Sequence, residues 1–305
     1  MPEMILHHYP LSPFSEKIRA MLGYTGMCWQ SAVTREMPPR PLLQPLAGGY
    51  RRIPVAQIGA DVFCDTRIIA AEIAALAGKP ELDYFRLDEA QQAFIAHTDF
   101  KVFFACILSA SGKALNKKAL ASMPVGDLFK LVWDRFNMGR HARVRLAGKN
   151  SKALVGTHIQ GLEQRLGSSD FLFGERPTHA DFSAYHSLWF LVDVGEKPLL
   201  AACPAVSAWM GRMRDFGTGV PKAISGIDAW RSAKDATPRE ISPDDQQDTL
   251  IGAEVSIAPA DYGLDPTHGR LVGSSPTRWI IAREQAQVGT VNVHFPKKGY
   301  ALSVR

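Results

Sequence analysis

Three short segments near the N-terminus constrain this chain most, because each places a polar group or a backbone edge at the end of a secondary-structure element. They are Ser12-Pro13-Phe14-Ser15, Ile53-Pro54-Val55 and Asp65-Thr66, in that order along the chain. Each segment is a weak signal alone. Together they predict a compact unit that presents a hydroxyl, a strand edge and a helix N-terminus to one small peptide-like ligand.

Ser12 is predicted to be the N-cap of the first helix. Residues 4–9 read as a strand that Pro10 ends, and Pro13 occupies the first helical position, where its missing N–H costs nothing. In one interpretation Ser12 only caps the helix. In the other its hydroxyl stabilises an anionic sulfur, because a helix N-terminus favours a thiolate over a thiol and the hydroxyl adds a charge-assisted hydrogen bond. Ser12 would then activate a ligand's nucleophile without being the nucleophile.

The other two segments extend this prediction to a backbone edge and a second helix start. Residues 55–58 and 62–63 read as adjacent strands, and Pro54 stands at the start of the first, where proline is allowed. If the Ile53–Pro54 bond is cis, the backbone of Val55 turns out of the sheet and pairs with an extended ligand. Asp65 either only caps the following helix, or that helix start offers N–H groups to a carboxylate and Thr66 adds a hydroxyl.

These segments resemble the thioredoxin-like half of glutathione S-transferases. The place of Ser12 is similar to that of the catalytic serine in the zeta and theta classes and of the cysteine in the omega class. The resemblance implies that Pro54 follows a cis bond and that the backbone of Val55 pairs with the cysteinyl part of glutathione. It also implies that Asp65 and Thr66 hold the γ-glutamyl end.

Several details of the site go with this resemblance. Arg52 resembles the basic residue often found two positions before the proline. The usual Glu-Ser pair of the family is Asp65-Thr66 here, with a carboxylate one methylene shorter. Serine in place of the omega-class cysteine argues against disulfide exchange. Tyr9 is a competing hydroxyl, as in the tyrosine-type classes, but His8 falls at that spacing, which favours Ser12.

Composition places the chain among soluble, enzyme-like proteins. Its 305 residues, 46% of them hydrophobic, are enough for two or three domains with buried cores. No run of 18 apolar residues and no signal-peptide layout is present, so no membrane partner is expected. The four scattered cysteines indicate free thiols in a reducing compartment, and hence a cytoplasmic protein. The nine histidines show no metal spacing, so no metal site is predicted.

Helical periodicity follows the first unit, which we place at residues 1–79. An all-helical domain is predicted over 84–232, and its Thr178-x-x-Asp181 capping box also resembles the family. Residues 233–249 are polar and read as a linker. From 250 to 305 the periodicity changes to two, which predicts five short strands in a small β-barrel-like domain of unknown role. The fold class is therefore an α/β thioredoxin-like domain, an all-α domain and a small all-β domain.

The first functional hypothesis is a glutathione transferase-like enzyme. Glutathione would be a substrate whose thiolate, stabilised by Ser12, attacks a small hydrophobic electrophile between the first two domains. Aromatic side chains could line the electrophile pocket or simply pack in the core; the candidates are Tyr9, Phe14, Phe100, Phe104 and Trp133. The resemblance further implies detoxification and a homodimer, and it leaves isomerase, dehalogenase and peroxidase variants open.

The second hypothesis is a non-catalytic binding or scaffold protein whose C-terminal strands contact a partner, since fold does not fix function. Nucleic acid is not the expected partner, because the basic residues after Leu250 are nearly balanced by acidic ones and form no run interleaved with aromatic residues.

Overall fold

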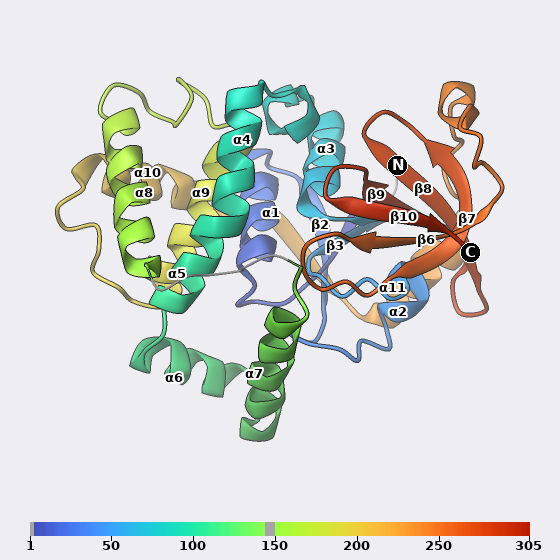
Figure 1. Cartoon of the computed structure of the whole chain (residues 1–305), viewed down its shortest axis with the longest axis horizontal. Helices are drawn as coiled ribbons and strands as arrows, with labels where there is room; N and C mark the ends of the chain where they lie inside the picture. The colour runs from blue at the N-terminus through green and yellow to red at the C-terminus, as the bar shows by residue number, and fades with distance from the viewer. Residues whose placement is uncertain (1–2, 144–149) are drawn as a thin grey trace.

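The computed structural model describes residues 3–143 and 150–305. Its N-terminal part is a thioredoxin-like unit around a four-stranded core (Figure 1). The elements are β1 (Met4–His8), α1 (Pro13–Tyr24), β2 (Cys28–Val33), α2 (Gln44–Ala47), β3 (Val55–Ile58), β4 (Asp61–Cys64) and α3 (Thr66–Ala77). β1 pairs in parallel with β2 and antiparallel with β3, which pairs antiparallel with β4. This order confirms the predicted class of the first unit.

Strands β1, β3 and β4 of this unit are buried on both faces. Met4 and Leu6 of β1 pack in a cluster with α1 and α3, whereas Ile5 between them packs in a second cluster with α2. Successive side chains of a strand point to opposite faces, so the run of apolar residues in β1 serves both layers at once.

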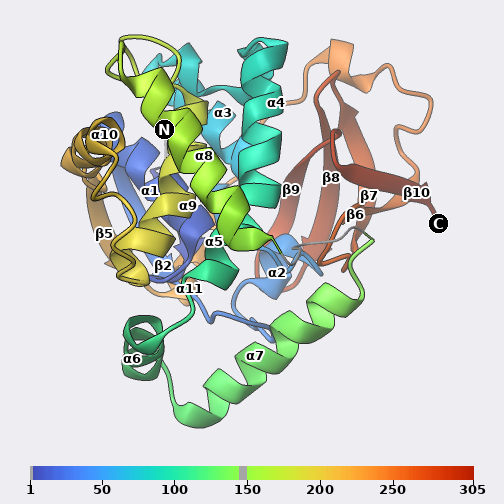
Figure 2. The same cartoon turned by 60° about the vertical axis from the view of Figure 1, so that its left-hand side comes forward.

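The helical domain packs against α1 on the side away from α2 (Figure 1). Its longer helices are α4 (Glu89–His97), α5 (Phe103–Ser109), α6 (Lys113–Ser122), α7 (Val125–Arg140), α8 (Ser151–Leu166), α9 (His179–Trp189) and α10 (Pro204–Asp215). Short helical turns are η1 (Pro80–Leu82), η2 (Tyr84–Arg86), η3 (Thr98–Val102), η4 (Phe190–Val194) and, later in the chain, η5 (Pro243–Gln246). Figure 2 shows α6 and α7 standing apart from the other helices.

The predicted capping box of α9 is confirmed. The Ala180 N–H donates to Thr178 Oγ1, and the Asp181 carboxylate accepts from the Thr178 N–H at 2.9 Å. Asp181 also accepts from the Trp209 indole of α10 at 3.1 Å. The box therefore fixes both the start of α9 and its contact with α10, as a folding element.

A buried charge pair fixes the helical domain on the thioredoxin-like unit. Lys17 of α1 is fully buried, and its Nζ donates to Asp99 Oδ2 of the turn after α4 at 2.7 Å. The other carboxylate oxygen lies 3.1 Å from His186 Nε2 of α9. Burial alone would raise the pKa of Asp99, but Lys17 and His186 hold it well below its usual range. Asp99 thus stays ionised and bonds to α1 of the thioredoxin-like unit and to α9 of the helical domain.

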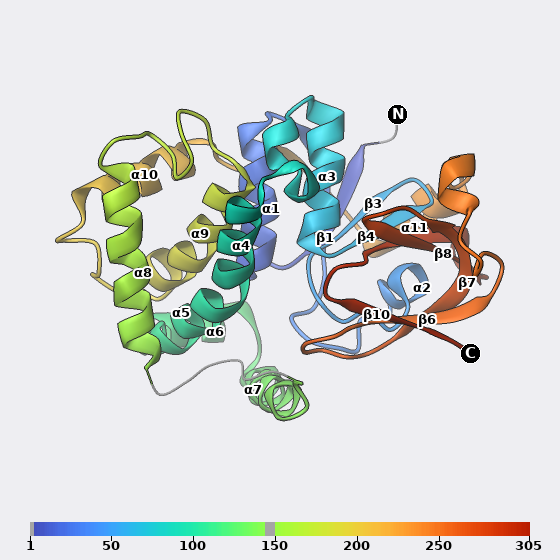
Figure 3. The same ribbon diagram turned by 45° about the horizontal axis from the view of Figure 1, so that its top comes forward.

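The five strands predicted in the last 56 residues are present. They are β6 (Glu254–Pro259), β7 (Thr267–Ser274), β8 (Arg278–Gln285), β9 (Gly289–Pro296) and β10 (Tyr300–Val304). They pair in the order β10-β6-β7-β8-β9 and curve around α2 (Figure 3). Apolar side chains of β6, β7, β8 and β9 enclose Leu46 and Ala47 of α2, which explains the alternating pattern of these strands.

The expectation of a separate barrel differs from the structure in one respect. β9 pairs in parallel with β4, so the C-terminal strands continue the thioredoxin sheet into a single ten-stranded sheet. A further strand, β5 (Val220–Ile224), lies within the range expected to be all-helical and pairs with β2 at the opposite edge. The alternating pattern shows that β6 to β10 are strands, but it does not show which open edge they join.

The segment expected to be a linker is anchored rather than loose. It begins at the end of α11 (Gly226–Lys234), and Arg239 donates its backbone N–H to Asp61 at 2.9 Å and its guanidinium to Glu72 at 3.0 Å. Within residues 3–143 and 150–305, no single helix is long and apolar enough to cross a membrane; only the bent pair Glu89–Ser109 and Lys113–Ser122 together reaches that length and composition.

Candidate functional site

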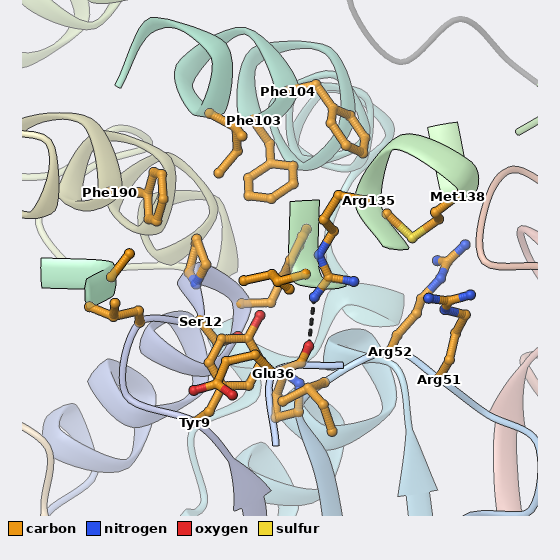
Figure 4. A pocket seen from close by; sticks show the side chains of 18 of the residues that line it. Tyr9, Ser12, Glu36, Arg51, Arg52, Phe103, Phe104, Arg135, Met138 and Phe190 are labelled. Carbon is orange, nitrogen blue, oxygen red and sulfur yellow. Dashed lines mark hydrogen bonds between the residues drawn. The ribbon is translucent and has the colours of Figure 1, made fainter. Parts of the chain in front are cut away.

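A cavity of about 400 Å³ lies between the thioredoxin-like unit and the helical domain (Figure 4). Its thioredoxin-like wall includes Tyr9, Ser12, Phe14, Ile53, Pro54, Asp65 and Thr66. Its helical wall is mainly apolar and includes Phe103, Phe104, Ile107, Leu128, Leu131 and Phe190. The volume and the few polar groups in an apolar lining are typical of a small-molecule site.

Ser12 caps α1, as predicted. The Ser15 N–H donates to Ser12 Oγ at 3.2 Å, and Pro13 is the first helical residue. Among the residues described, the Ser12 hydroxyl donates no hydrogen bond, so its proton is free to be donated into the cavity. The positive end of the helix lies at the same point, which favours a negative charge there.

Arg19 holds the loop that carries Ser12. Its guanidinium donates to the carbonyls of Tyr9 and Pro10 at 3.3 and 2.9 Å and to the Glu16 carboxylate at 2.6 Å. Arg19 Nη1 also lies 3.0 Å from His8 Nδ1, and because a guanidinium has only donors, Nδ1 is the acceptor. The proton of the His8 ring is therefore on Nε2, which donates to Ser31 Oγ at 2.8 Å. Burial and then Arg19 lower the pKa of His8 to about 4, which keeps it neutral.

The Ile53–Pro54 bond is cis, as the resemblance implies. Ile53 and Pro54 line the cavity. Val55 is fully buried and lies in the ladder between His7 of β1 and Cys64 of β4. Of the turn residues Ile53, Pro54 and Val55, the first two line the cavity and Val55 does not, so the pairing of Val55 with a ligand stays a prediction.

Asp65 and Thr66 also line the cavity, and Asp65 caps α3 with a φ of 82°. Its carboxylate accepts three hydrogen bonds from Arg67, and it accepts a fourth from Tyr300 of β10 at 3.1 Å. Burial would raise the pKa of Asp65, but Arg67 outweighs it and lowers the pKa to about 2. The carboxylate is therefore ionised and already committed to protein partners, and Thr66 is the freer of the two residues.

Arg52 lines the cavity and is bound to the C-terminal strands. Its guanidinium donates to the Asp261 carboxylate and to the Tyr262 carbonyl, both in the loop between β6 and β7. The ring of Tyr262 lies 4.0 Å from the guanidinium carbon. Tyr262 itself lines the cavity. Reasoning from the sequence missed this residue, because no local pattern links positions 52 and 262.

The predicted aromatic pocket is only partly assembled. Tyr9, Phe14 and Phe104 line the cavity, but Phe100 does not and instead packs against Phe104 at a ring distance of 5.4 Å. Trp133 does not line it either: it is 63% exposed on the outer face of α7. The inner face of α7 supplies other lining side chains, among them Arg135, which donates to the Glu36 carbonyl at 2.7 Å (Figure 4).

In the described part of the chain, no group of three or more His, Cys, Asp or Glu side chains is placed to hold a metal. The four cysteines are unpaired thiols, and Cys64 and Cys106 are buried. Burial raises the pKa of Cys106 to about 12, which keeps that thiol protonated and unreactive.

Comparison with known proteins agrees with this architecture. The family model of the glutathione S-transferase N-terminal domain matches residues 6–81, and that of the C-terminal domain matches residues 149–212. No curated protein sequence matches significantly. The crystal structure of a GST-like protein from Pseudomonas syringae is 32% identical, with a TM-score of 0.78, and the match covers 100% of both chains. That similarity includes the C-terminal strands.

Other solved structures share the fold at low identity. A glutathione S-transferase from Rhodospirillum rubrum F11 is 16% identical, covering 69% of this chain and 87% of its own, with a TM-score of 0.51. A glutathione S-transferase-I bound with lactoylglutathione is 18% identical, covering 70% and 94%, with a TM-score of 0.50. Two family models, and a relative 32% identical over its full length, show that the chain belongs to the glutathione S-transferase superfamily.

Proposed function

We propose that this chain is a glutathione-dependent transferase in which Ser12 stabilises the thiolate of bound glutathione. The observation that carries the proposal is the Ser12 hydroxyl, which lines the cavity, accepts from the Ser15 N–H and keeps its own proton free to donate. A sulfur placed there would also meet the positive end of α1. Both effects lower the pKa of a thiol and raise its reactive fraction.

The apolar helical wall supports a hydrophobic second substrate. Phe103, Phe104 and Phe190 line the cavity on the side facing Ser12 (Figure 4). In the proposed step the thiol proton passes to solvent and the sulfur forms a bond to an electrophilic carbon. A leaving group departs with its electron pair, or water supplies a proton if the reaction is an addition. Isomerisation, dehalogenation and peroxide reduction begin from the same thiolate and belong in the substrate screen.

Ser12→Ala tests this role. We expect kcat/KM for conjugation to fall by about tenfold or more, while glutathione affinity changes by less than about threefold, because the hydroxyl acts on the thiolate rather than on the whole tripeptide. Ser187→Ala is the matched control, since Ser187 is a fully buried serine of α9 that does not line the cavity. Turnover that is unchanged in Ser12→Ala would remove the assigned role.

A second candidate function is a non-catalytic binding protein with this fold. The observation that favours it is that Arg52 is already bound to Asp261 of the β6–β7 loop and Asp65 to Tyr300 of β10. Calorimetric titration together with a conjugation assay separates the two candidates. Saturable glutathione binding in the micromolar to low millimolar range, weakened by Thr66→Ala and accompanied by turnover of an electrophile, supports the transferase. No heat, checked by a second binding probe, or binding without turnover supports the non-catalytic protein.

A further inference from the structure

The loop between β6 and β7, residues 260–266, reaches from the C-terminal strands into the cavity that contains Ser12. Tyr262 is the residue of this loop that lines the cavity. Its ring lies 5.3 Å from the ring of Phe104 on the helical wall and 4.0 Å from the guanidinium carbon of Arg52 on the other wall. Tyr262 therefore contacts both walls and forms a third one between them.

This loop is held in place by several independent contacts. The Asp261 carboxylate accepts from Arg52 and from the Tyr262 N–H, and the Asp261 carbonyl accepts from the Arg143 N–H at 2.8 Å. At its far end the loop approaches Gly49 so closely that a Cβ there would lie 2.1 Å from the Pro266 carbonyl oxygen. Glycine at position 49 is thus required by the path of the loop. These contacts fix the loop as one wall of the site.

One polar group at this wall is left without a partner. The Nε–H of Arg52 is buried and has no acceptor among the residues described, although the same guanidinium donates to Asp261 and to the Tyr262 carbonyl. A buried charged donor without an acceptor is costly, and a ligand carboxylate would satisfy it. Asp65 and Thr66 line the same cavity. A ligand carboxylate therefore suits this end of the cavity better than an apolar group.

We propose that Tyr262 is a specificity-determining residue of the thiol site, which covers Arg52 and closes the end of the cavity that receives the amino-acid end of the thiol substrate. This inference rests on the proposed function, because it takes glutathione as that substrate. The ring keeps water from Arg52, so the interaction of the guanidinium with a carboxylate is stronger than it is at an open surface. Burial raises the pKa of Tyr262, so the phenol stays neutral beside that carboxylate.

The proposal predicts a preference for thiols that carry the γ-glutamyl group. The wild-type chain should bind glutathione about tenfold or more tightly than cysteinylglycine, which lacks that group, because Arg52 otherwise keeps an unpaired donor. In Tyr262→Ala the glutathione affinity should fall by about tenfold while the cysteinylglycine affinity changes by less than about threefold. Tyr262→Phe should stay within about threefold of wild type for both, because the ring face supplies the cover.

Calorimetric titration of both thiols into the full chain tests this, with His268→Ala as the control on the exposed surface of β7. Circular dichroism and thermal melts show whether Tyr262→Ala folds, and Tyr262→Leu provides a second variant if it does not. Equal loss of both thiols, or no loss of glutathione, in a folded Tyr262 variant overturns the inference. Absence of glutathione binding by the wild type overturns the proposed function instead, so the two failures are distinguishable.

Discussion

Asp61 of β4 and His294 of β9 face each other at the pairing that joins the two parts of the sheet, with Asp61 Oδ1 2.9 Å from His294 Nε2. Both side chains are almost fully buried. The second carboxylate oxygen of Asp61 accepts from the backbone and the guanidinium of Arg239, at 2.9 and 3.3 Å. One carboxylate therefore ties β4 to β9 and to the segment that precedes the C-terminal strands.

Removal of this carboxylate should destabilise the whole chain. In Asp61→Ala we expect the free energy of unfolding to fall by about 3 kcal/mol, because the buried His294 loses its partner and Arg239 loses both of its hydrogen bonds to β4. Urea unfolding followed by circular dichroism measures the change. Arg231→Ala, which breaks an exposed ion pair with Asp228 and leaves the cap of α11 in place, should change stability little. Equal effects of the two substitutions would show that the Asp61 contacts are not structurally important.

Acidification should destabilise the fold from about pH 6.5 downward. Burial lowers the pKa of His7 to about 4 and that of His179 to about 3, so the unfolded chain binds protons more readily than the folded one below the usual histidine pKa. Their contribution to stability is complete above the unfolded pKa and is lost progressively as the pH falls toward the folded values. At pH 5 each of these histidines should lower the free energy of unfolding by about 2 kcal/mol relative to its value above the unfolded pKa.

Urea unfolding at pH 7.5 and pH 5.0 checks this expectation. His179→Asn should lose less stability between the two pH values than the wild type, by about 2 kcal/mol, since one buried titrating group is gone. His268→Asn, an exposed position, should behave as the wild type does. A free energy of unfolding that is equal at both pH values would contradict the assignment of neutral buried histidines.

Arg19→Met should disturb the loop that carries Ser12 as well as the stability of the fold. It removes the donors to the carbonyls of Tyr9 and Pro10 and leaves the buried Glu16 carboxylate unpaired, which should cost about 3 kcal/mol. Urea unfolding measures that cost, and kcat/KM for conjugation reports the position of Ser12. Arg19→Lys should not restore either, because an ammonium cannot reproduce the fork of guanidinium donors. Restoration by lysine would mean that only the charge matters.

Gly49→Ala and Gly161→Ala should have opposite effects on stability. At Gly49 the new Cβ would lie 2.1 Å from the Pro266 carbonyl oxygen, so the loop that carries Tyr262 must move, at a cost of about 1–3 kcal/mol. At Gly161, within α8, no atom lies within 4 Å of the new Cβ, and alanine should stabilise the helix by about 0.5–1 kcal/mol. Thermal melts of both variants test the pair, and destabilisation by Gly161→Ala would contradict the open surroundings of that position.

Features that depend on neighbours in the chain were predictable. The caps of α1 and α9 follow from Ser12 and Thr178, because an N-cap side chain bonds to the backbone two or three residues later. The five C-terminal strands follow from alternation, because side chains of a strand point to opposite faces in turn. The cis bond at Pro54 came from the family resemblance and is confirmed.

The sequence did not predict which side of a helix or turn faces the cavity. Helix α7 has apolar residues on both sides, so its periodicity indicates a helix but not that Leu131 faces the cavity while Trp133 lies outside. At the cis-proline turn, residues only two positions apart differ in whether they pair in the β-ladder or line the cavity. The ladder includes Val55 and leaves Ile53 at the cavity.

The sequence by itself therefore determined α1 and α9 with their caps, the C-terminal strands and the family, since these depend on contacts within a few residues or on motifs of the family. Tertiary structure alone decided that β9 extends the sheet at β4 and that Tyr262 covers Arg52, contacts that join residues more than 200 positions apart. The physical reason is that a strand edge or a guanidinium accepts many partners of the right chemistry. Which one it receives depends on how the intervening chain packs.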